Sequence, residues 1–485
     1  MDLSTSAVIK LLGPKIPMIL KTVAWHSLGF SKTSTKWDLK TELVIHVLRS
    51  IIDSPYQRPI SVQQKASILI RDQVVKGRMW ISRVKVYAPP EDDIRQALFE
   101  TIEQMQTGDE VYTKPEFQTV EAEWTGYRPN VDKDSPELSL PEEERYKKLM
   151  HDVHSNVTIL YFHGGGYYLL DPASHRPVVT RLAKLTGGRA LSIRYRLAPQ
   201  NPFPAPLLDA LLSYLYLLYP PPGSFHEPVS PSNIVFTGDS AGGNLSLVLL
   251  QLILHLHRTI PNGQTPTLKF HGKDVAIPIP AGIATISPWL DITHSLPSLE
   301  KNAKYDYLPR PMPTFVTASP PCDIWPSNPP RADMYCDGSA LMHPLVSPLA
   351  AMHWKMAPPV FIGCGEEMLA DEDAVFAKRL VKQGVKVVWE QYEAMPHCFA
   401  MLFPGHPGGR MFFAELAKFI KMVAEKPSEV NAQGHWVTAR KLQRVEVDVA
   451  ALTKLEDEEV LAMMKLAQDR RIKRFARDGM ALAKL

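Results

Sequence analysis

Between residues 156 and 425, short apolar runs rich in β-branched and aromatic residues alternate with helical patterns. This alternation constrains the fold most, because repeated strand and helix units favour a mostly parallel sheet with helices on both faces. The run 245–256 is almost wholly apolar, as expected of a helix buried against such a sheet. We therefore predict an α/β fold. The predicted strands are 157–162, 234–236, 360–362 and 385–392, and the predicted helices are 175–186, 205–219, 243–257 and 372–383.

The first 145 residues contain further elements. Residues 80–86 and 120–124 alternate as strands do, and 91–106 fit a helix between them. Before residue 55, two apolar stripes at helical spacing predict two helices. Such a stripe can dock on the protein's own core, lie on a lipid surface or cover a ligand pocket; Lys10, Lys15, Lys21 and Trp25 suit a membrane interface. The stripes are Ile16, Ile19, Leu20, Val23 and Leu39, Leu43, Val47, Ile51.

Composition excludes several classes of protein. The 485 residues carry a formal net charge of +3, too small to indicate a nucleic-acid binder. The four cysteines form no C-x-x-C pair, and we interpret them as reduced thiols of a cytoplasmic protein. Lysines and prolines interrupt the N-terminal apolar residues, so we predict no secretory signal and no membrane span, only peripheral membrane contact at most.

The segment Gly238-Asp239-Ser240-Ala241-Gly242-Gly243 follows a predicted strand and opens a predicted helix. This is the context of a nucleophile elbow, a sharp turn that holds a serine hydroxyl above the sheet. The glycines two residues before and after Ser240 remove the bulk that such a turn excludes. Ser240 is the candidate nucleophile.

The segment His163-Gly164-Gly165-Gly166 follows another predicted strand. Successive glycines let backbone N–H groups point into a cavity, where they can stabilise the oxyanion of acyl transfer. We expect the N–H groups of Gly164, Gly165 and Ala241 to form this oxyanion hole.

A serine nucleophile needs an imidazole base, and the base needs an orienting carboxylate. His397, on a loop after a late strand, is the candidate base. The chain order serine, acid, histidine does not choose among five candidate acids between Ser240 and His397: Glu366, Glu367, Asp371, Glu372 and Asp373.

The chain resembles the hormone-sensitive-lipase-like branch of the α/β hydrolases, also called α/β-hydrolase fold-3 esterases, over about residues 156–425. In that family the acid usually opens an Asp-Pro-Leu-x-Asp-Glu segment, which reads Glu367-Met-Leu-Ala-Asp-Glu372 here, so the resemblance implies Glu367, with Asp371 as second choice. Cys398 stands where the family usually has glycine. The shared motifs are His163–Gly166, Tyr195-Arg-Leu-Ala-Pro199, Pro202-Phe-Pro-Ala205 leading to Asp209, Gly238–Gly243, Ser287-Pro-Trp-Leu-Asp291, His343-Pro-Leu-Val-Ser-Pro348 and His397-Cys-Phe399.

The resemblance also implies a cap over the site, built from N-terminal helices and an insertion at about 295–342. We accordingly divide the chain into an extension (1–145), a hydrolase domain (146–425) and a charged helical tail (426–485). Residues 442–466 and 470–485 are predicted helices of that tail. Its basic cluster (Arg470, Arg471, Lys473, Arg474, Arg477) is either a solvated face or a membrane or partner contact.

These residues predict a serine hydrolase for small-molecule esters, with no metal or organic cofactor and no nucleic-acid partner. The aromatic insertion favours hydrophobic substrates. One alternative is a deacetylase or amidase acting on a sterol, a secondary metabolite or a formamide. Another is a ligand-binding receptor that keeps the fold without catalysis. The oligomeric state is left open.

Overall fold

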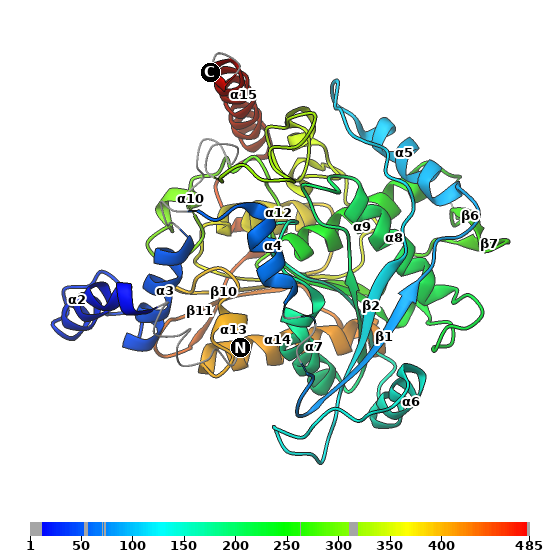
Figure 1. The fold of residues 1–485 in the computed structure, drawn as a ribbon, viewed down its shortest axis with the longest axis horizontal. Helices are drawn as coiled ribbons and strands as arrows, with labels where there is room; N and C mark the ends of the chain where they lie inside the picture. Colours follow the sequence, from blue (N-terminus) through cyan, green and yellow to red (C-terminus); the bar gives the residue numbers. More distant parts are fainter. Residues whose placement is uncertain are drawn as a thin grey trace.

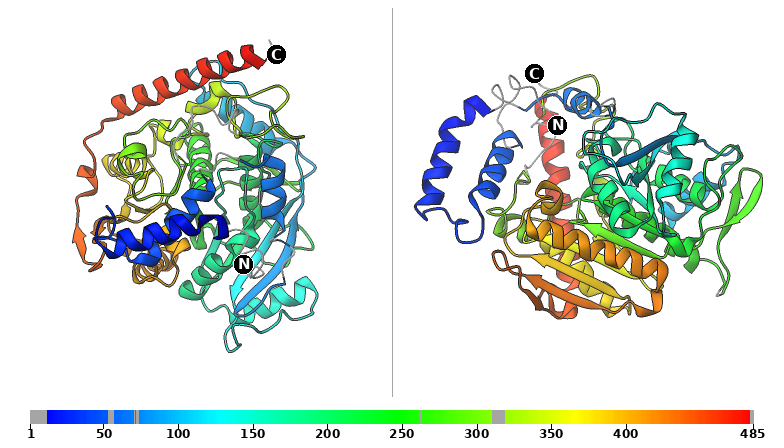
Figure 2. Two further views of the ribbon diagram at one scale, coloured as in Figure 1. Left: turned by 60° about the vertical axis from the view of Figure 1, so that its left-hand side comes forward. Right: turned by 90° about the horizontal axis from the view of Figure 1, so that it is seen from below.

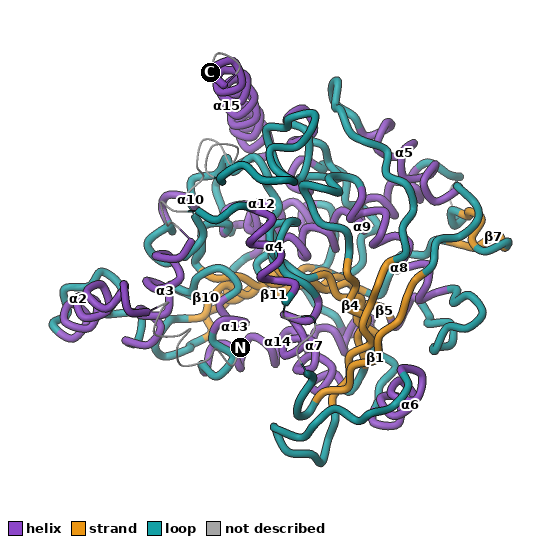
Figure 3. The backbone as a smooth tube through the Cα atoms, in the orientation of Figure 1, coloured by secondary structure: helices purple, strands orange, loops and turns teal. Residues whose placement is uncertain are grey.

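The computed structural model describes residues 12–52, 57–69, 71, 74–261, 263–309 and 319–482. One large sheet crosses the molecule, with the strand order β1-β2-β4-β3-β5-β8-β9-β10-β11-β12 (Figures 1 and 3). From β4 to β11 every pairing is parallel, and the pairs β1–β2, β2–β4 and β11–β12 are antiparallel. The strands are β1 (Met79–Val86), β2 (Val120–Tyr127), β3 (Thr158–Phe162), β4 (Arg189–Arg194), β5 (Ile234–Asp239), β8 (Gly282–Ile286), β9 (Val360–Gly365), β10 (Val387–Tyr392), β11 (Gln433–Val437) and β12 (Arg444–Glu446).

Helices cover both faces of this sheet, as predicted (Figure 3). On one face α8 (Ala205–Leu218), α9 (Ala241–Arg258) and α12 (Ala370–Lys382) enclose one hydrophobic core. On the other, α7 (Pro172–Thr186) and α14 (Pro407–Glu425) enclose a second. Side chains of each strand alternate between the two cores, so the strands are apolar on both faces. Leu160 lies in the first core and Tyr161 in the second.

The extension (1–145) is joined to the rest of the chain through the sheet. β1 and β2, predicted from their alternation, pair with β4, and α5 (Asp93–Met105) and α6 (Glu142–Asp152) flank them. Among the described residues, three α-helices precede β1: α2 (Ile16–Ser27), α3 (Leu39–Ile52) and α4 (Ile60–Ile68). α2 and α3 lie at the outer margin of the molecule (Figure 1). The guanidinium of Arg49 on α3 donates to the carbonyl of Ala303, so the N-terminal helices and the insertion are in contact.

The tail differs from our expectation. We predicted a helix over 442–466, but residues 433–446 supply β11 and β12, and α15 (Asp457–Leu482) begins later. The strand within the predicted helix is β12: the edge of β11 provides unpaired backbone groups for it, and this antiparallel pairing outweighs the helical pattern of the segment. Part of α15 is buried instead of solvated: Val460 and Met464 join the first core, and Arg471 pairs with Asp333 of the insertion at 2.9 Å. Within the described residues, no helix is long and apolar enough to cross a membrane.

The two remaining strands, β6 (Thr267–Phe270) and β7 (Lys273–Ala276), form a separate hairpin. The short helices α10 (Ser298–Lys301) and α13 (Phe399–Leu402) lie in the insertion and after the His397 loop.

Burial of the tail helix predicts a stability difference between neighbouring side chains of α15. Met464→Ala should lower the free energy of unfolding by about 2–5 kcal/mol, because it opens a cavity in the first core. The matched control is Leu466→Ala, whose side chain is 51% exposed; its effect should stay within about 0.5 kcal/mol. Denaturant unfolding of the full chain measures both, and equal effects would contradict docking of the tail.

Candidate active site

Ser240 occupies the sharp turn between β5 and α9. Its backbone has φ 52° and ψ −119°, a conformation that costs a non-glycine residue about 1–3 kcal/mol and that surrounding packing must impose. Its N–H donates to the carbonyl of Ile286 at 3.0 Å and its own carbonyl accepts from Trp289 at 3.1 Å. A Cβ atom on Gly242 would lie 1.9 Å from the carbonyl oxygen of Phe162, so the turn requires glycine there. The half-buried side chain of Ser240 is thus held at the carboxyl edge of the sheet.

The glycine run after β3 lies against this turn through Asp239. The buried Asp239 carboxylate accepts hydrogen bonds from the hydroxyl of Tyr161 at 2.8 Å and from the N–H of Gly164 at 3.1 Å, and His175 Nε2 lies 3.3 Å away. Burial alone would raise the pKa of Asp239, but His175 and Tyr161 outweigh it and the pKa lies below its ordinary value. A charged Asp239 therefore fixes the glycine run relative to the serine turn.

The three expected oxyanion donors are not equivalent in this geometry. The N–H of Gly164 is already taken by Asp239, whereas no described residue accepts from the N–H groups of Gly165 and Ala241. Gly165 has φ 108°, and a Cβ atom there would lie 2.2 Å from the carbonyl oxygen of Leu169. The loop geometry therefore depends on glycine at this position.

His163 and Gly166 complete the glycine-run segment. The His163 ring stacks on Tyr195 with centroids 4.3 Å apart, and its Nδ1 lies 2.7 Å from the carbonyl oxygen of Gly164. Burial lowers the pKa of His163 to about 4, so this ring is neutral. His163 thus supports the loop and does not act as a charged group.

His397 and Glu367 form a buried pair. Nδ1 of His397 lies 2.7 Å from Oε1 of Glu367, and both side chains are almost wholly excluded from solvent. Oε2 of Glu367 accepts from the N–H of Gly365 at 2.9 Å and from the hydroxyl of Ser287 at 2.6 Å. Because an ionised carboxylate only accepts hydrogen bonds, Nδ1 carries a proton and Nε2 is the nitrogen left to act as a base.

The pKa of His397 reflects opposing effects. Burial alone would lower the pKa of His397, but the Cys398 sulfur and the Glu367 carboxylate outweigh it, so the pKa lies well above its ordinary value of 6.5. Burial raises the pKa of the Cys398 thiol to about 11, so that thiol is neutral at pH 7. The Glu367 carboxylate is therefore the hydrogen-bonded partner that holds the pKa of His397 up.

The other candidate acids have different partners. The carboxylate of Asp371 accepts from the N–H of Ser298 in the insertion at 2.8 Å, and that of Glu366 accepts from the N–H of Ala394. Glu372 accepts from the N–H of Leu290, and the carboxylate of Asp373 has no hydrogen-bond partner among the described residues. The structure therefore places Glu367, and none of the other four, against the imidazole.

The serine turn and the histidine loop meet at the end of β8. The carbonyl of Ile286 accepts from the N–H of Ser240, and Cys398 Sγ lies 4.0 Å from the same oxygen. The hydroxyl of Ser287 accepts from the N–H of Cys398 at 3.1 Å while donating to Glu367. Cys398 has φ 49° and ψ 34°, a left-handed conformation that favours glycine.

Sequence reasoning missed Asp306, a residue of the insertion. Its buried carboxylate accepts from the N–H of His397 at 3.2 Å and from the N–H of Met368, which follows Glu367, at 2.8 Å. Burial and the nearby Glu367 charge raise the pKa of Asp306. No motif marks this aspartate; only its position in the folded insertion reveals that it joins the base and acid loops.

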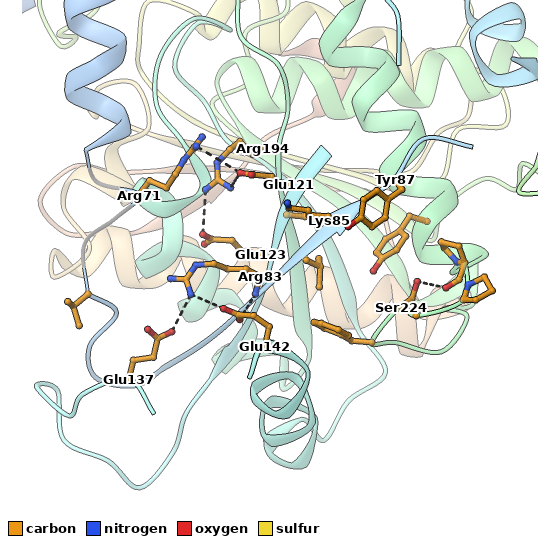
Figure 4. A pocket seen from close by; sticks show the side chains of 18 residues that line it. Arg71, Arg83, Lys85, Tyr87, Glu121, Glu123, Glu137, Glu142, Arg194 and Ser224 are labelled. Atoms are coloured by element: carbon orange, nitrogen blue, oxygen red, sulfur yellow. Dashed lines mark hydrogen bonds and ion pairs between the residues drawn. The ribbon is translucent and has the colours of Figure 1, made fainter. Parts of the chain in front are cut away.

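Among the described residues, one cavity lies away from this cluster and another borders it. One of about 910 Å³ is on β1 and β2, where Arg194 pairs with Glu121 and Arg83 with Glu142 (Figure 4). None of the candidate catalytic residues lines it. The other, of about 440 Å³, lies between Arg49 and the insertion and reaches Asp306. It therefore adjoins the residue that joins the two catalytic loops.

Known proteins resemble this chain over the same region. Residues 159–401 match the family model described as alpha/beta hydrolase fold. An acetyl-hydrolase of Streptomyces hygroscopicus is 29% identical over 267 residues, which make up 54% of this chain and 75% of that protein. Carboxylesterase NlhH of Mycobacterium tuberculosis is 30% identical over 252 residues, 51% of this chain and 68% of that protein.

Solved structures give the same result for the fold. The crystal structure of an esterase from the bacterial hormone-sensitive lipase family aligns with a TM-score of 0.54 and 22% identity, covering 80% of this chain and 99% of that one. At this identity the likeness shows a shared fold, and it agrees with the resemblance predicted from the motifs.

The geometry predicts that Glu367 and Asp371 differ in their effect on the base. Glu367→Gln should lower kcat on the order of 10⁴-fold, because the imidazole loses its orienting charge. It should also move the acid limb of the kcat/KM profile to lower pH. In the wild type that limb lies above pH 6.5, since a neutral base is lost as the pH falls through the raised pKa of His397. Asp371→Asn should leave the limb in place. A larger loss of kcat for Asp371→Asn than for Glu367→Gln would instead identify Asp371 as the acid that orients His397.

Proposed function

This chain belongs to the α/β-hydrolase fold family and is a carboxylic-ester hydrolase. We propose that Ser240, His397 and Glu367 are its catalytic residues and that the reaction proceeds through an acyl-enzyme. The observation that carries this proposal is the buried hydrogen bond between His397 and Glu367. The loop that bears it meets the serine turn at the carbonyl of Ile286.

In the first half-reaction, Oγ of Ser240 attacks the ester carbonyl carbon while Nε2 of His397 takes the hydroxyl proton. Glu367 stabilises the imidazolium that forms. The tetrahedral intermediate collapses, the bond to the alcohol oxygen breaks, and His397 gives its proton to that oxygen. Water then attacks the acyl-enzyme with His397 again acting as base, which releases the carboxylic acid and restores Ser240.

The oxyanion of both tetrahedral intermediates is assigned to the N–H groups of Gly165 and Ala241. These two donors have no described acceptor: Ala241 follows the serine in the chain, and Gly165 follows the residue that Asp239 binds, so they are the N–H groups free to bind the charge as it develops. Gly164 was also expected to donate, but its N–H holds Asp239 and we assign it a positioning role.

Hydrophobic esters are the substrate class that the surroundings of the site favour. Tyr307 of the insertion lies with its ring centroid 6.2 Å from that of His397. Tyr335, also from the insertion, stacks on Tyr167 after the glycine run with centroids 3.8 Å apart. Aromatic side chains from the insertion therefore border both halves of the site and suit an apolar acyl or alcohol group.

A deacetylase activity is the second candidate, because one relative is an acetyl-hydrolase. The same serine, histidine and oxyanion donors would remove an acetyl group from a larger hydrophobic alcohol. The two candidates differ only in which side of the ester carries the apolar group.

Replacement of the nucleophile tests the mechanism. Ser240→Ala should lower kcat for a p-nitrophenyl ester on the order of 10⁶-fold, because the acyl-enzyme cannot form. Ser230→Ala is the matched control, since Ser230 is exposed and lies ten residues earlier. Undiminished turnover by Ser240→Ala would end the proposal, because another group would then carry the reaction. A wild type without turnover would leave the fold as a ligand-binding scaffold.

A substrate series tests the proposed preference. Over p-nitrophenyl esters of increasing acyl length, kcat/KM should rise from acetate to medium chains, because each buried methylene adds about 0.8 kcal/mol of binding. A steryl acetate and an anilide in the same assay separate deacetylase and amidase activity. A value that falls steadily from acetate, with no turnover of the steryl acetate, would contradict a hydrophobic-ester hydrolase.

A further inference from the structure

The helix α2 packs against α3 with its polar side. The buried hydroxyl of Thr22 lies 2.9 Å from Nδ1 of His46, and Nδ1 of His26 bonds to Glu42. Near the start of α2, the ammonium of Lys15 donates to the carbonyl of Ser50 at 3.1 Å. Hydrogen bonds and charge therefore join the polar side chains of α2, and Lys15 before it, to α3.

Part of the apolar surface of α2 faces solvent: Ile19 and Val23 are half-buried, but Ile16 and Leu20 are exposed. Figures 1 and 2 show α2 and α3 at the outer margin of the molecule, with α2 beyond α3 as seen from the sheet. The outer face of α2 consists of Ile16, Leu20, Trp25 and Leu28, with Phe30 in the turn that follows; these side chains are 52%, 64%, 50%, 66% and 70% exposed. Ile16, Leu20 and Leu28 recur at multiples of four and form one ridge.

Within residues 12–37, the segment that carries this face, the formally charged side chains have one sign. Residues 12–37 include four lysines (Lys15, Lys21, Lys32 and Lys36) and no aspartate or glutamate. Lys36 pairs with Glu393, and the ammonium of Lys21 lies 4.8 Å from the ring centroid of Trp25. Lys21 and Lys32 are exposed and border the apolar ridge. An apolar ridge with a basic border matches the interface of an anionic bilayer, where lipid tails and negative headgroups meet.

We propose that α2 docks in the plane of an anionic lipid surface, with its outer face entering the headgroup boundary and Lys21 and Lys32 facing the headgroups. A second copy of the chain fits less well, because a two-fold contact through this face would bring the same lysines of both copies together. An anionic lipid surface can contact the apolar ridge with its acyl chains and the lysines with its negative headgroups.

Vesicle co-sedimentation of the full chain tests this proposal. The wild type should sediment with vesicles of equal parts phosphatidylcholine and phosphatidylserine, and less with phosphatidylcholine alone. Leu20→Glu/Leu28→Glu should remain in the supernatant. The control Leu185→Glu/Leu466→Glu makes the same charge change at exposed leucines of α7 and α15 and should bind as the wild type does.

A second variant tests the contribution of the lysine charges to binding while the apolar ridge is unchanged. Lys21→Gln/Lys32→Gln leaves the ridge intact and should weaken binding to the anionic vesicles by about fivefold per lysine, with binding to phosphatidylcholine unchanged. Turnover of a soluble short-chain ester should be unchanged in all variants, which shows that they fold.

Three results would overturn the proposal. These are a wild type that stays in the supernatant with both vesicles, a Leu20→Glu/Leu28→Glu variant that binds like the wild type, or a dimer in sedimentation velocity that this variant dissociates. The last result would assign the face to a second copy.

Discussion

The buried carboxylate of Glu367 is the interaction on which the catalytic edge of the sheet depends. A buried charge without partners costs several kcal/mol, so its donors must stay in place. Here the donors are His397 Nδ1, the N–H of Gly365 and the hydroxyl of Ser287, which follow β10, end β9 and follow β8. One charge thereby holds three strand ends in a fixed relation, and Asp306 adds the insertion to the same assembly.

A second buried carboxylate does the same for the other half of the site. Asp239 ends β5 and binds the glycine run after β3, so the serine turn and the oxyanion loop are fixed relative to one another. The segment Ile286–Ser287 lies between the two halves and bonds to both. In the proposed mechanism, donors and base are thus oriented before substrate arrives, which is the condition for electrostatic stabilisation of a transition state.

Motif and periodicity predicted much of this arrangement, because the elbow, the glycine run and the acid–histidine order are local or ordered in the chain. They did not predict β4 and β8. β4 carries Arg189, Ser192 and Arg194, and β8 is five residues long and begins at a glycine, so neither gives a clear apolar run. Asp306 was missed because its partners lie more than 60 residues away. Periodicity predicted the apolar stripe of α2 but not which side of the helix faces solvent, because that depends on the polar partners of α2, which lie on α3.

The N-terminal helices connect these features. The indole N–H of Trp37, between α2 and α3, donates to the carbonyl of Ala394 at 2.6 Å, and Arg49 binds the segment that leads to Asp306.

The central claim remains that the Ser240 hydroxyl is the nucleophile. Its most direct test is to treat the full chain with a fluorophosphonate and locate the adduct by peptide mass spectrometry. The account predicts one adduct, on Ser240, that forms more slowly when Glu367 is replaced by glutamine; an unlabelled chain, or an adduct on another residue, would contradict it.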